Sequence, residues 1–137
     1  DQLAKEMESL GHEIMGDKMG TWYGRDAGNV RSAGAVVLIG AERIWRGVPN
    51  CGFCGFSDCV SCKSSGGNCA LAYVDLGIAV SSAVTVAAAD QVDCRIMFSI
   101  GKTAMHLPLG EGEVLWLGIP LAVSGKNIFF DRGIVHD

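Results

Sequence analysis

The chain has 137 residues, of which 49% are hydrophobic and 19% are charged, and its formal net charge is −4. This balance predicts a single folded domain over residues 1–137 with a hydrophobic core, and it excludes a largely disordered chain. Lysine and arginine form no basic block, so we do not expect nucleic acid as a partner.

Cysteine usage favours a reduced protein. Five of the 6 cysteines lie between Cys51 and Cys69, a span of 19 residues. A disulfide scaffold usually spreads its bridges along a small secreted chain, and the start Asp1-Gln2-Leu3 has no secretory signal pattern. The sequence therefore predicts metal binding and a cytoplasmic location.

The first predicted elements precede the cysteines. Apolar residues repeat at helical spacing from Gln2 to about Asp17, which predicts an amphipathic surface helix. Asp26 is expected to cap a short helix that runs through Val30. The apolar run over residues 35–40, bounded by glycines, predicts a buried strand.

The longest predicted element is a helix over residues 70–89, which is apolar on all sides. Asp75 lies inside it, and a carboxylate there argues against a membrane span. We therefore expect a buried central helix that also forms the interface of a homodimer. Asp75 is expected to cap a neighbouring loop or to pair with an arginine such as Arg95.

The remaining elements complete the predicted fold class. We expect a strand over residues 95–100, a short helix over 102–107, a strand over 114–119 and an extended piece over 127–131. The order of helices and strands predicts an α/β or α+β fold, with helices packed on a small sheet and a cysteine-rich loop, residues 50–69, inserted into it.

The cysteine segment carries the chemistry. Its residues run Cys51-Gly52-Phe53-Cys54-Gly55-Phe56-Ser57-Asp58-Cys59-Val60-Ser61-Cys62, and Cys69 follows. Thiolates at such short spacings are typical ligands of iron–sulfur clusters. The two glycines permit unusual backbone angles and leave amides free to bind sulfur, and the two phenylalanines are expected to shield the cluster from water.

Zinc stays open as a rival to iron and sulfur at this point. A structural zinc site also uses pairs of cysteines, although its pairs usually come from separated knuckles. The ligand set is open as well. Cys54, Cys59 and Cys62 have the spacing of plant-type 2Fe–2S proteins, whereas Cys51, Cys54 and Cys59 followed by Cys69 is the alternative.

The run from Cys51 to Cys59 resembles the CxxCGxxxxC motif of 4Fe–4S domains in bacterial electron-transport ferredoxin subunits. From about Asp26 onward the chain is similar to a family of uncharacterised bacterial and archaeal proteins that contain a ferredoxin domain. The C-terminal stretches Gly118-Ile119-Pro120-Leu121 and Gly125-Lys126-Asn127-Ile128-Phe129-Phe130-Asp131-Arg132 carry much of that similarity. The resemblance implies one 4Fe–4S cluster on Cys51, Cys54, Cys59 and Cys69, with Cys62 as the second choice for the fourth ligand.

The long helix, the strand that follows and Gly118-Ile119-Pro120 also resemble the core of flavin-dependent nitroreductases. That resemblance implies FMN at the interface of a homodimer. It also implies that an N-terminal part of the family domain is missing before Asp1. Lys126, Asn127 and Arg132 offer cations and a turn to a phosphate or carboxylate, although a simple turn with a surface salt bridge fits them too.

The sequence thus predicts an iron–sulfur protein that transfers electrons through one 4Fe–4S cluster to a partner protein or to a bound flavin. One alternative is an FMN-dependent, nitroreductase-like oxidoreductase that the cluster supplies with electrons. The other is a structural zinc-binding module. The sequence identifies no general acid or base, so catalytic residues are not assigned.

Overall fold

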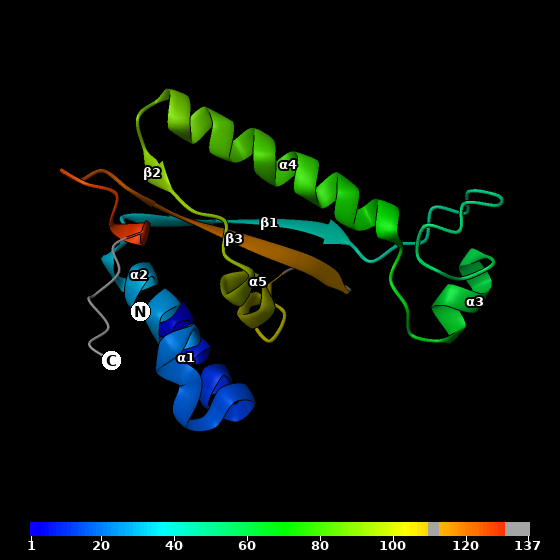
Figure 1. Ribbon diagram of the computed structural model, residues 1–137, viewed down its shortest axis with the longest axis horizontal. Helices are drawn as coiled ribbons and strands as arrows, with labels where there is room; N and C mark the ends of the chain where they lie inside the picture. The colour runs from blue at the N-terminus through cyan, green and yellow to red at the C-terminus, as the bar shows by residue number, and fades with distance from the viewer. Residues whose placement is uncertain (110–112, 131–137) are drawn as a thin grey trace.

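A three-stranded antiparallel sheet forms the centre of the protein. The computed structural model describes residues 1–109 and 113–130. The strands are β1 (Ala35–Glu42), β2 (Asp93–Cys94) and β3 (Val114–Ala122), in the order β1-β3-β2. One long helix covers one face of the sheet and three shorter helices cover the other (Figure 1). The predicted α/β or α+β class is confirmed.

The N-terminal helices form the lower layer. The predicted first helix is confirmed as α1 (Gln2–Met15), which continues into a 3-10 turn, η1 (Gly16–Thr21). The second helix, α2 (Tyr23–Ser32), begins three residues before the predicted cap. Their apolar faces meet in a core that includes Met7, Ile100 and Phe129, each at most 1% exposed.

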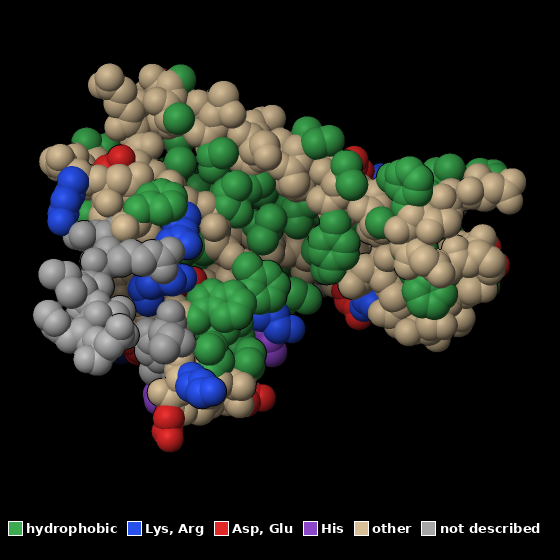
Figure 2. Space-filling model, viewed as in Figure 1, with side chains coloured by type: hydrophobic (Ala, Val, Ile, Leu, Met, Phe, Trp, Pro, Cys, Tyr) green, Lys and Arg blue, Asp and Glu red, His purple; other side chains and the backbone are tan. Residues whose placement is uncertain are grey.

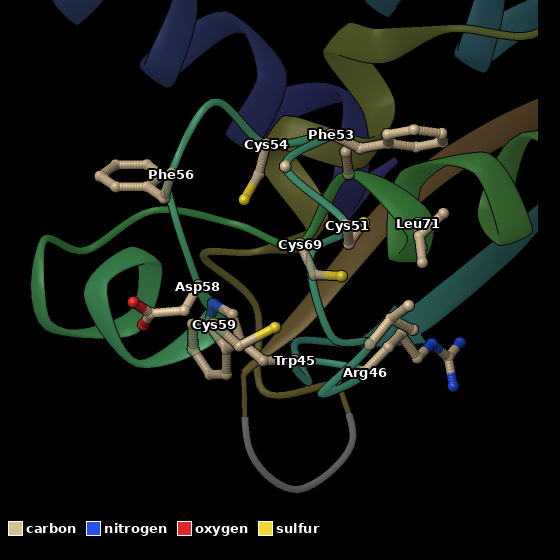
Figure 3. A pocket seen from close by; sticks show the side chains of 13 residues that line it. Trp45, Arg46, Cys51, Phe53, Cys54, Phe56, Asp58, Cys59, Cys69 and Leu71 are labelled. Carbon is tan, nitrogen blue, oxygen red and sulfur yellow. The ribbon is translucent and has the colours of Figure 1, made fainter.

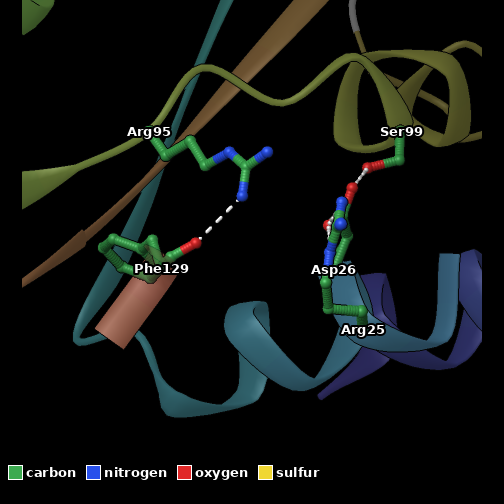
Figure 4. Close-up of polar contacts among 5 residues, drawn as sticks. All are labelled: Arg25, Asp26, Arg95, Ser99 and Phe129. Carbon is green, nitrogen blue, oxygen red and sulfur yellow. Dashed lines mark hydrogen bonds and ion pairs between the residues drawn. The ribbon is translucent and has the colours of Figure 1, made fainter. Parts of the chain in front are cut away.

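Asp26 does not cap α2, so that prediction was wrong. The residue lies inside the helix and is only 2% exposed. Its carboxylate accepts hydrogen bonds from the guanidinium of Arg25 at 2.7 Å and from Ser99 Oγ at 2.6 Å (Figure 4). A buried carboxylate needs such partners, and the hydrogen bond from Ser99 joins α2 to the next helix of the layer.

The segment over residues 93–107 also differs from the prediction. β2 is only two residues long, Met97 forms an isolated bridge to Gly118, and α5 covers Phe98–Ala104 instead of 102–107. The physical reason is close packing of this helix on β3. A Cβ atom on Gly101 would lie 1.9 Å from the carbonyl oxygen of Trp116, and Ile100 is fully buried. Local alternation of apolar residues did not reveal this contact.

The long helix α4 (Ala70–Ala89) has the predicted bounds but not the predicted burial. Only Ala72, Leu76 and Val80 are buried against the sheet, while Ile78 and Val86 are 62% and 63% exposed. The helix is long and apolar enough to cross a membrane, a property that core helices of folded domains share, and 17% of that apolar stretch is buried here. The expected homodimer interface on this helix stays a prediction.

Asp75 pairs with an arginine, as expected, but this arginine is Arg46 and not Arg95, and Asp75 is not buried. Its carboxylate pairs with Arg46, and its side chain is 53% exposed. Arg95 instead donates a hydrogen bond to the carbonyl oxygen of Phe129 at 2.9 Å (Figure 4). The surface ion pair therefore ties the start of α4 to the segment that leaves β1.

The last described residues form a 3-10 turn, η2 (Ile128–Phe130), where an extended piece was predicted. The Asn127 side chain causes this difference, because its Oδ1 accepts a hydrogen bond from the backbone N–H of Phe129 at 3.1 Å. An asparagine that bonds the backbone two residues later favours a turn over a strand. The Phe129 ring is then buried in the core.

The cysteine loop lies at one end of this layered scaffold. It connects the end of β1 to the start of α4 and contains one short helix, α3 (Cys59–Ser64). Figure 1 shows the loop and α3 at the end of the molecule opposite η2. The loop is thus attached to the scaffold through β1 and α4.

Candidate metal centre

Four of the cysteines line one hollow at the base of the loop. They are Cys51, Cys54, Cys59 and Cys69, and the hollow measures about 370 Å³ including the part that opens to solvent. Figure 3 shows them arranged around it together with Trp45 and Arg46. All six cysteines are free thiols. Among residues 1–109 and 113–130, no three Cys, His, Asp or Glu side chains converge closely enough to hold a single metal ion.

The backbone between Cys51 and Cys54 follows the predicted unusual path. Gly52 and Gly55 have φ angles of 62° and 83°, and Asn50 has a φ of 54°. The N–H of Gly55 donates to the carbonyl oxygen of Gly52 at 2.9 Å, which closes a tight turn between the two cysteines. Residues of positive φ in a turn help to form concave nests of backbone N–H groups, which favour anions such as thiolate sulfur.

Asp58 determines where α3 begins, and therefore where Cys59 lies. Its carboxylate accepts hydrogen bonds from the backbone N–H of Ser61 at 2.8 Å and from the Ser61 hydroxyl at 3.1 Å. These bonds, together with the Ser57 hydroxyl, hold the pKa of Asp58 below its usual range, the Ser61 N–H having the largest effect. This is the standard role of an N-cap aspartate. It places Cys59 at the first helical position.

Cys69 lies at the N-terminal end of α4, where it is the N-cap residue and 8% exposed. The backbone N–H of Arg46 is the main group that lowers the pKa of this thiol. The N–H groups of Ala72 and Leu71 and the charge of Arg46 act in the same direction, against the effect of burial. A helix N-terminus stabilises a thiolate. Cys69 therefore lies where a thiolate is stabilised.

Cys62 has the opposite environment. It is fully buried, it does not line the hollow, and its Sγ donates a hydrogen bond to the carbonyl oxygen of Asn68 at 3.6 Å. Burial raises the pKa of this thiol, and the nearby Cys54 and Cys59 raise it further, whereas the Trp45 indole lowers it. A Cβ atom on Gly67 would lie 2.9 Å from its sulfur. Cys62 is thus a tightly packed thiol whose hydrogen points to a carbonyl oxygen.

Trp45 is a residue of the site that the sequence reasoning missed. Two cations lie over its ring, with the Arg43 guanidinium carbon 5.6 Å and the Lys63 Nζ 5.3 Å from the ring centroid. Its indole Nε1 is buried and, among residues 1–109 and 113–130, has no hydrogen-bond partner of good geometry, although it lies close enough to the Cys62 sulfur to lower the pKa of that thiol. The only signal in the sequence is that Trp45 lies close before the cysteines, between two arginines.

Arg43 was missed as well, and it fastens the loop to the scaffold. Its Nε donates to Asn68 Oδ1 at 2.5 Å, its Nη2 donates to the carbonyl oxygen of Gly66 at 2.8 Å, and its Nη1 pairs with Glu113 at 2.6 Å. One side chain at the end of β1 thus holds the far end of the cysteine loop next to β3. No local pattern in the sequence indicates contacts over such separations.

The two phenylalanines line the edge of the hollow without covering it. The Phe53 ring is 74% exposed, and Figure 3 shows the Phe53 and Phe56 rings pointing away from the cysteines. Phe56 packs near Gly67, where an added Cβ atom would lie 3.0 Å from its ring. The aromatic ring inside the site is that of Trp45.

The predicted phosphate-binding residues lie away from the cysteines. Lys126 and Asn127 follow the end of β3, which pairs with the start of β1, whereas the cysteine loop follows the end of β1. An eight-residue strand separates these two ends by about 25 Å. Arg132, the third predicted residue, lies outside the described residues.

Comparison with known proteins supports the family resemblance. Residues 65–132 match a family described as "Uncharacterized protein containing a ferredoxin domain", and that match includes Cys69. A protein of Archaeoglobus fulgidus, described as "Uncharacterized protein", is 39% identical over 140 residues, which cover 96% of this chain and 73% of that protein.

No solved structure matches the chain, so the resemblance to nitroreductases stays a prediction. The similarity to the archaeal protein extends over nearly the whole chain and thus includes the segment with the first three cysteines. The chain belongs to the family of proteins that contain this ferredoxin domain.

Proposed function

We propose that this protein binds one 4Fe–4S cluster through Cys51, Cys54, Cys59 and Cys69 and that it transfers single electrons. The observation that carries the proposal is that these four residues, and neither Cys62 nor Cys94, line one hollow. The ferredoxin-domain family supports the iron–sulfur chemistry in general. The choice of a cubane cluster rests on the number and arrangement of the cysteines.

The protein contributes ligands and electrostatic support at this centre. Cys51 and Cys54 are held by the turn at Gly52 and Gly55, and Cys59 is held by the capped start of α3. Cys69 adds a thiolate at the N-terminus of a 20-residue helix, where the helix dipole favours negative charge. When bound, the cluster supplies the one-electron redox chemistry.

Two further residues would control the surroundings of the cluster. Trp45 places a large apolar ring in the hollow, which excludes water and so affects the reduction potential. Its indole N–H is available as a hydrogen-bond donor to sulfur. Arg43 fixes the distance between the loop and β1 through its bonds to Asn68 and Gly66.

The exposure of the loop supports a redox partner protein. Phe53 projects from the cysteine loop with 74% of its surface exposed, so a redox partner protein can approach the centre closely. We propose that this electron transfer takes place in a reducing compartment such as the cytoplasm. We also propose that the protein forms a homodimer through α4. Exposed Val74, Ile78 and Val86 on the outer face of α4 support the homodimer.

The test is a spectroscopic titration of protein purified without oxygen. The protein should absorb broadly near ~400 nm, and dithionite should bleach that band and produce the EPR signal of a reduced cluster. A potentiometric titration should then follow a single one-electron transition. A colourless protein with one zinc ion and no sulfide would replace this proposal with a structural zinc module.

A further inference from the structure

A groove beside β3 is not used by the cluster site. Two adjoining hollows of about 1190 and 550 Å³, both open to solvent, lie between α4, α5 and β3. We call them together the α4–α5 groove. The residues that line both hollows are Tyr73, Phe98, Lys102, Met105, Leu115 and Trp116. Figure 2 shows hydrophobic side chains gathered between the two helices on this face.

Three aromatic rings from different elements line this groove. Tyr73 on α4 is 47% exposed and Phe98 on α5 is 55% exposed. Trp116 is fixed by β1, because a Cβ atom on Gly40 would lie 2.6 Å from its ring. Three aromatic rings along one groove, two of them exposed, are suited to a flat conjugated ring, which stacks on them and removes their apolar surface from water.

A cation without an ionic partner completes the lining. Lys102 is half-buried and lines both hollows. Within residues 1–109 and 113–130, Arg25, Arg31, Arg43 and Arg46 all form salt bridges, but Lys102 forms none. A half-buried ammonium beside aromatic walls favours a ligand that carries an acidic group.

The groove begins next to the cluster site. Asn68, which directly precedes Cys69, lines the larger hollow, and its Nδ2 donates to the hydroxyl of Tyr73 at 3.0 Å. Arg43 lines the same hollow and binds Asn68 Oδ1. A molecule in the groove would therefore lie beside the proposed fourth ligand, with Tyr73 and Asn68 between them.

We propose that the α4–α5 groove binds a planar aromatic electron carrier with an acidic group and that this molecule exchanges electrons with the cluster. The electron exchange rests on the proposed function. Flavin nucleotides and acidic quinones share this chemistry. Reduction of one such ring takes two electrons and two protons from water. The reduced cluster gives the first electron, the redox partner protein reduces the cluster again, and the cluster then gives the second electron. This site is distinct from the region of Lys126 and Asn127.

Equilibrium dialysis of the anaerobic holoprotein tests the site without reference to activity. The probes are FMN, its neutral counterpart riboflavin, and naphthoquinone sulfonate. Lys102→Gln should weaken binding of the two anionic probes about tenfold and leave riboflavin unchanged, because only the ionic contact is lost. Phe98→Ala should weaken all three. Lys5→Gln and Ile14→Ala, two changes at exposed positions on α1, are the matched controls and should change none.

The outcomes separate the two proposals. Binding of FMN alone would identify a flavin nucleotide, and binding of the sulfonate alone would identify a quinone. No binding up to about 1 mM, or equal effects of Lys102→Gln and Lys5→Gln, would overturn the groove site and leave the cluster untouched. Protein that binds a probe but contains no iron would overturn the proposed function, and with it the electron exchange, but not the ligand site.

Discussion

The scaffold and the cysteine loop are stabilised in different ways. The scaffold has two apolar clusters, one between the sheet and the α1, α2 and α5 layer and one beneath α4. Within residues 50–69, only Cys62 and Cys69 are buried hydrophobic side chains. The loop depends instead on positive-φ turns, a capped short helix and the hydrogen bonds of Arg43. Burial of apolar groups thus stabilises the scaffold, and the loop is left to be stabilised by its ligand.

The largest expected effect comes from removal of one thiolate in the loop. Cys69→Ser should abolish the absorbance near ~400 nm and lower iron content at least about tenfold, because a serine hydroxyl does not replace the thiolate at the start of α4. Circular dichroism should show an intact scaffold. Cys62→Ser and Cys94→Ser are the controls and should retain iron. Loss of iron in Cys62→Ser with retention in Cys69→Ser would exchange the two roles.

The second prediction concerns the scaffold and leaves the cysteine loop unchanged. Gly101→Ala should lower the free energy of unfolding by about 3 kcal/mol, since its Cβ atom would lie 1.9 Å from the carbonyl oxygen of Trp116 and must displace backbone. Gly28→Ala in α2 is the control. It has no atom within 4 Å of the added Cβ, so it should stabilise by about 0.5–1 kcal/mol. Denaturant titration measures both variants, and iron per folded molecule should stay unchanged in each.

A smaller effect is expected where the two regions are joined. Arg43→Met retains the stem of the side chain but loses its bonds to Asn68, Gly66 and Glu113, so the loop should open more often. We expect iron to be lost to a chelator about three to ten times faster. This rate change corresponds to a fall of about 1 kcal/mol in the free energy of loop opening. Arg31→Met removes only an exposed ion pair with Glu8 and should leave the rate unchanged. Equal rates in both variants would mean that Arg43 does not fasten the loop.

The smallest effect concerns the cap of α3. The pKa of Asp58 is lowered in the folded protein, chiefly by the N–H of Ser61. Its contribution to stability is therefore present above the unfolded pKa, near 3.8, and is lost as the pH falls through the lower folded value. Asp58→Asn should remove this pH dependence while keeping a cap, and Asp58→Ala should remove both. Amide exchange of residues 59–64 between about pH 3 and 6 measures the stability of the start of α3 as a function of pH. Identical profiles for all three proteins would contradict this account of the cap.

The sequence predicted those parts of the protein that depend on local pattern. Apolar periodicity located α1 and α4, and cysteine spacing located the loop and the glycine turns inside it. The prediction from sequence failed where a contact between residues far apart in the chain decides the structure. The helix at residues 98–104 depends on how Gly101 packs on Trp116, and the burial of Asp26 depends on Ser99.

The same limit applies to the candidate site. Cysteine spacing is a local property, so the sequence alone could predict four ligands, and the proposed choice of Cys69 over Cys62 agrees with the hollow that Cys69 lines. Trp45 and Arg43 reach the site only because β1 ends beside it, and no spacing in the sequence shows that. The outer face of α4 was expected to be buried because hydrophobicity alone does not show which face the sheet covers.

The most direct test is quantitative metal and sulfide analysis of anaerobically purified protein. The account predicts about four irons and four acid-labile sulfides per chain, with both contents retained in Cys62→Ser and lost in Cys69→Ser. One zinc ion per chain without sulfide, or two irons and two sulfides that depend on Cys62, would contradict a 4Fe–4S centre on Cys51, Cys54, Cys59 and Cys69.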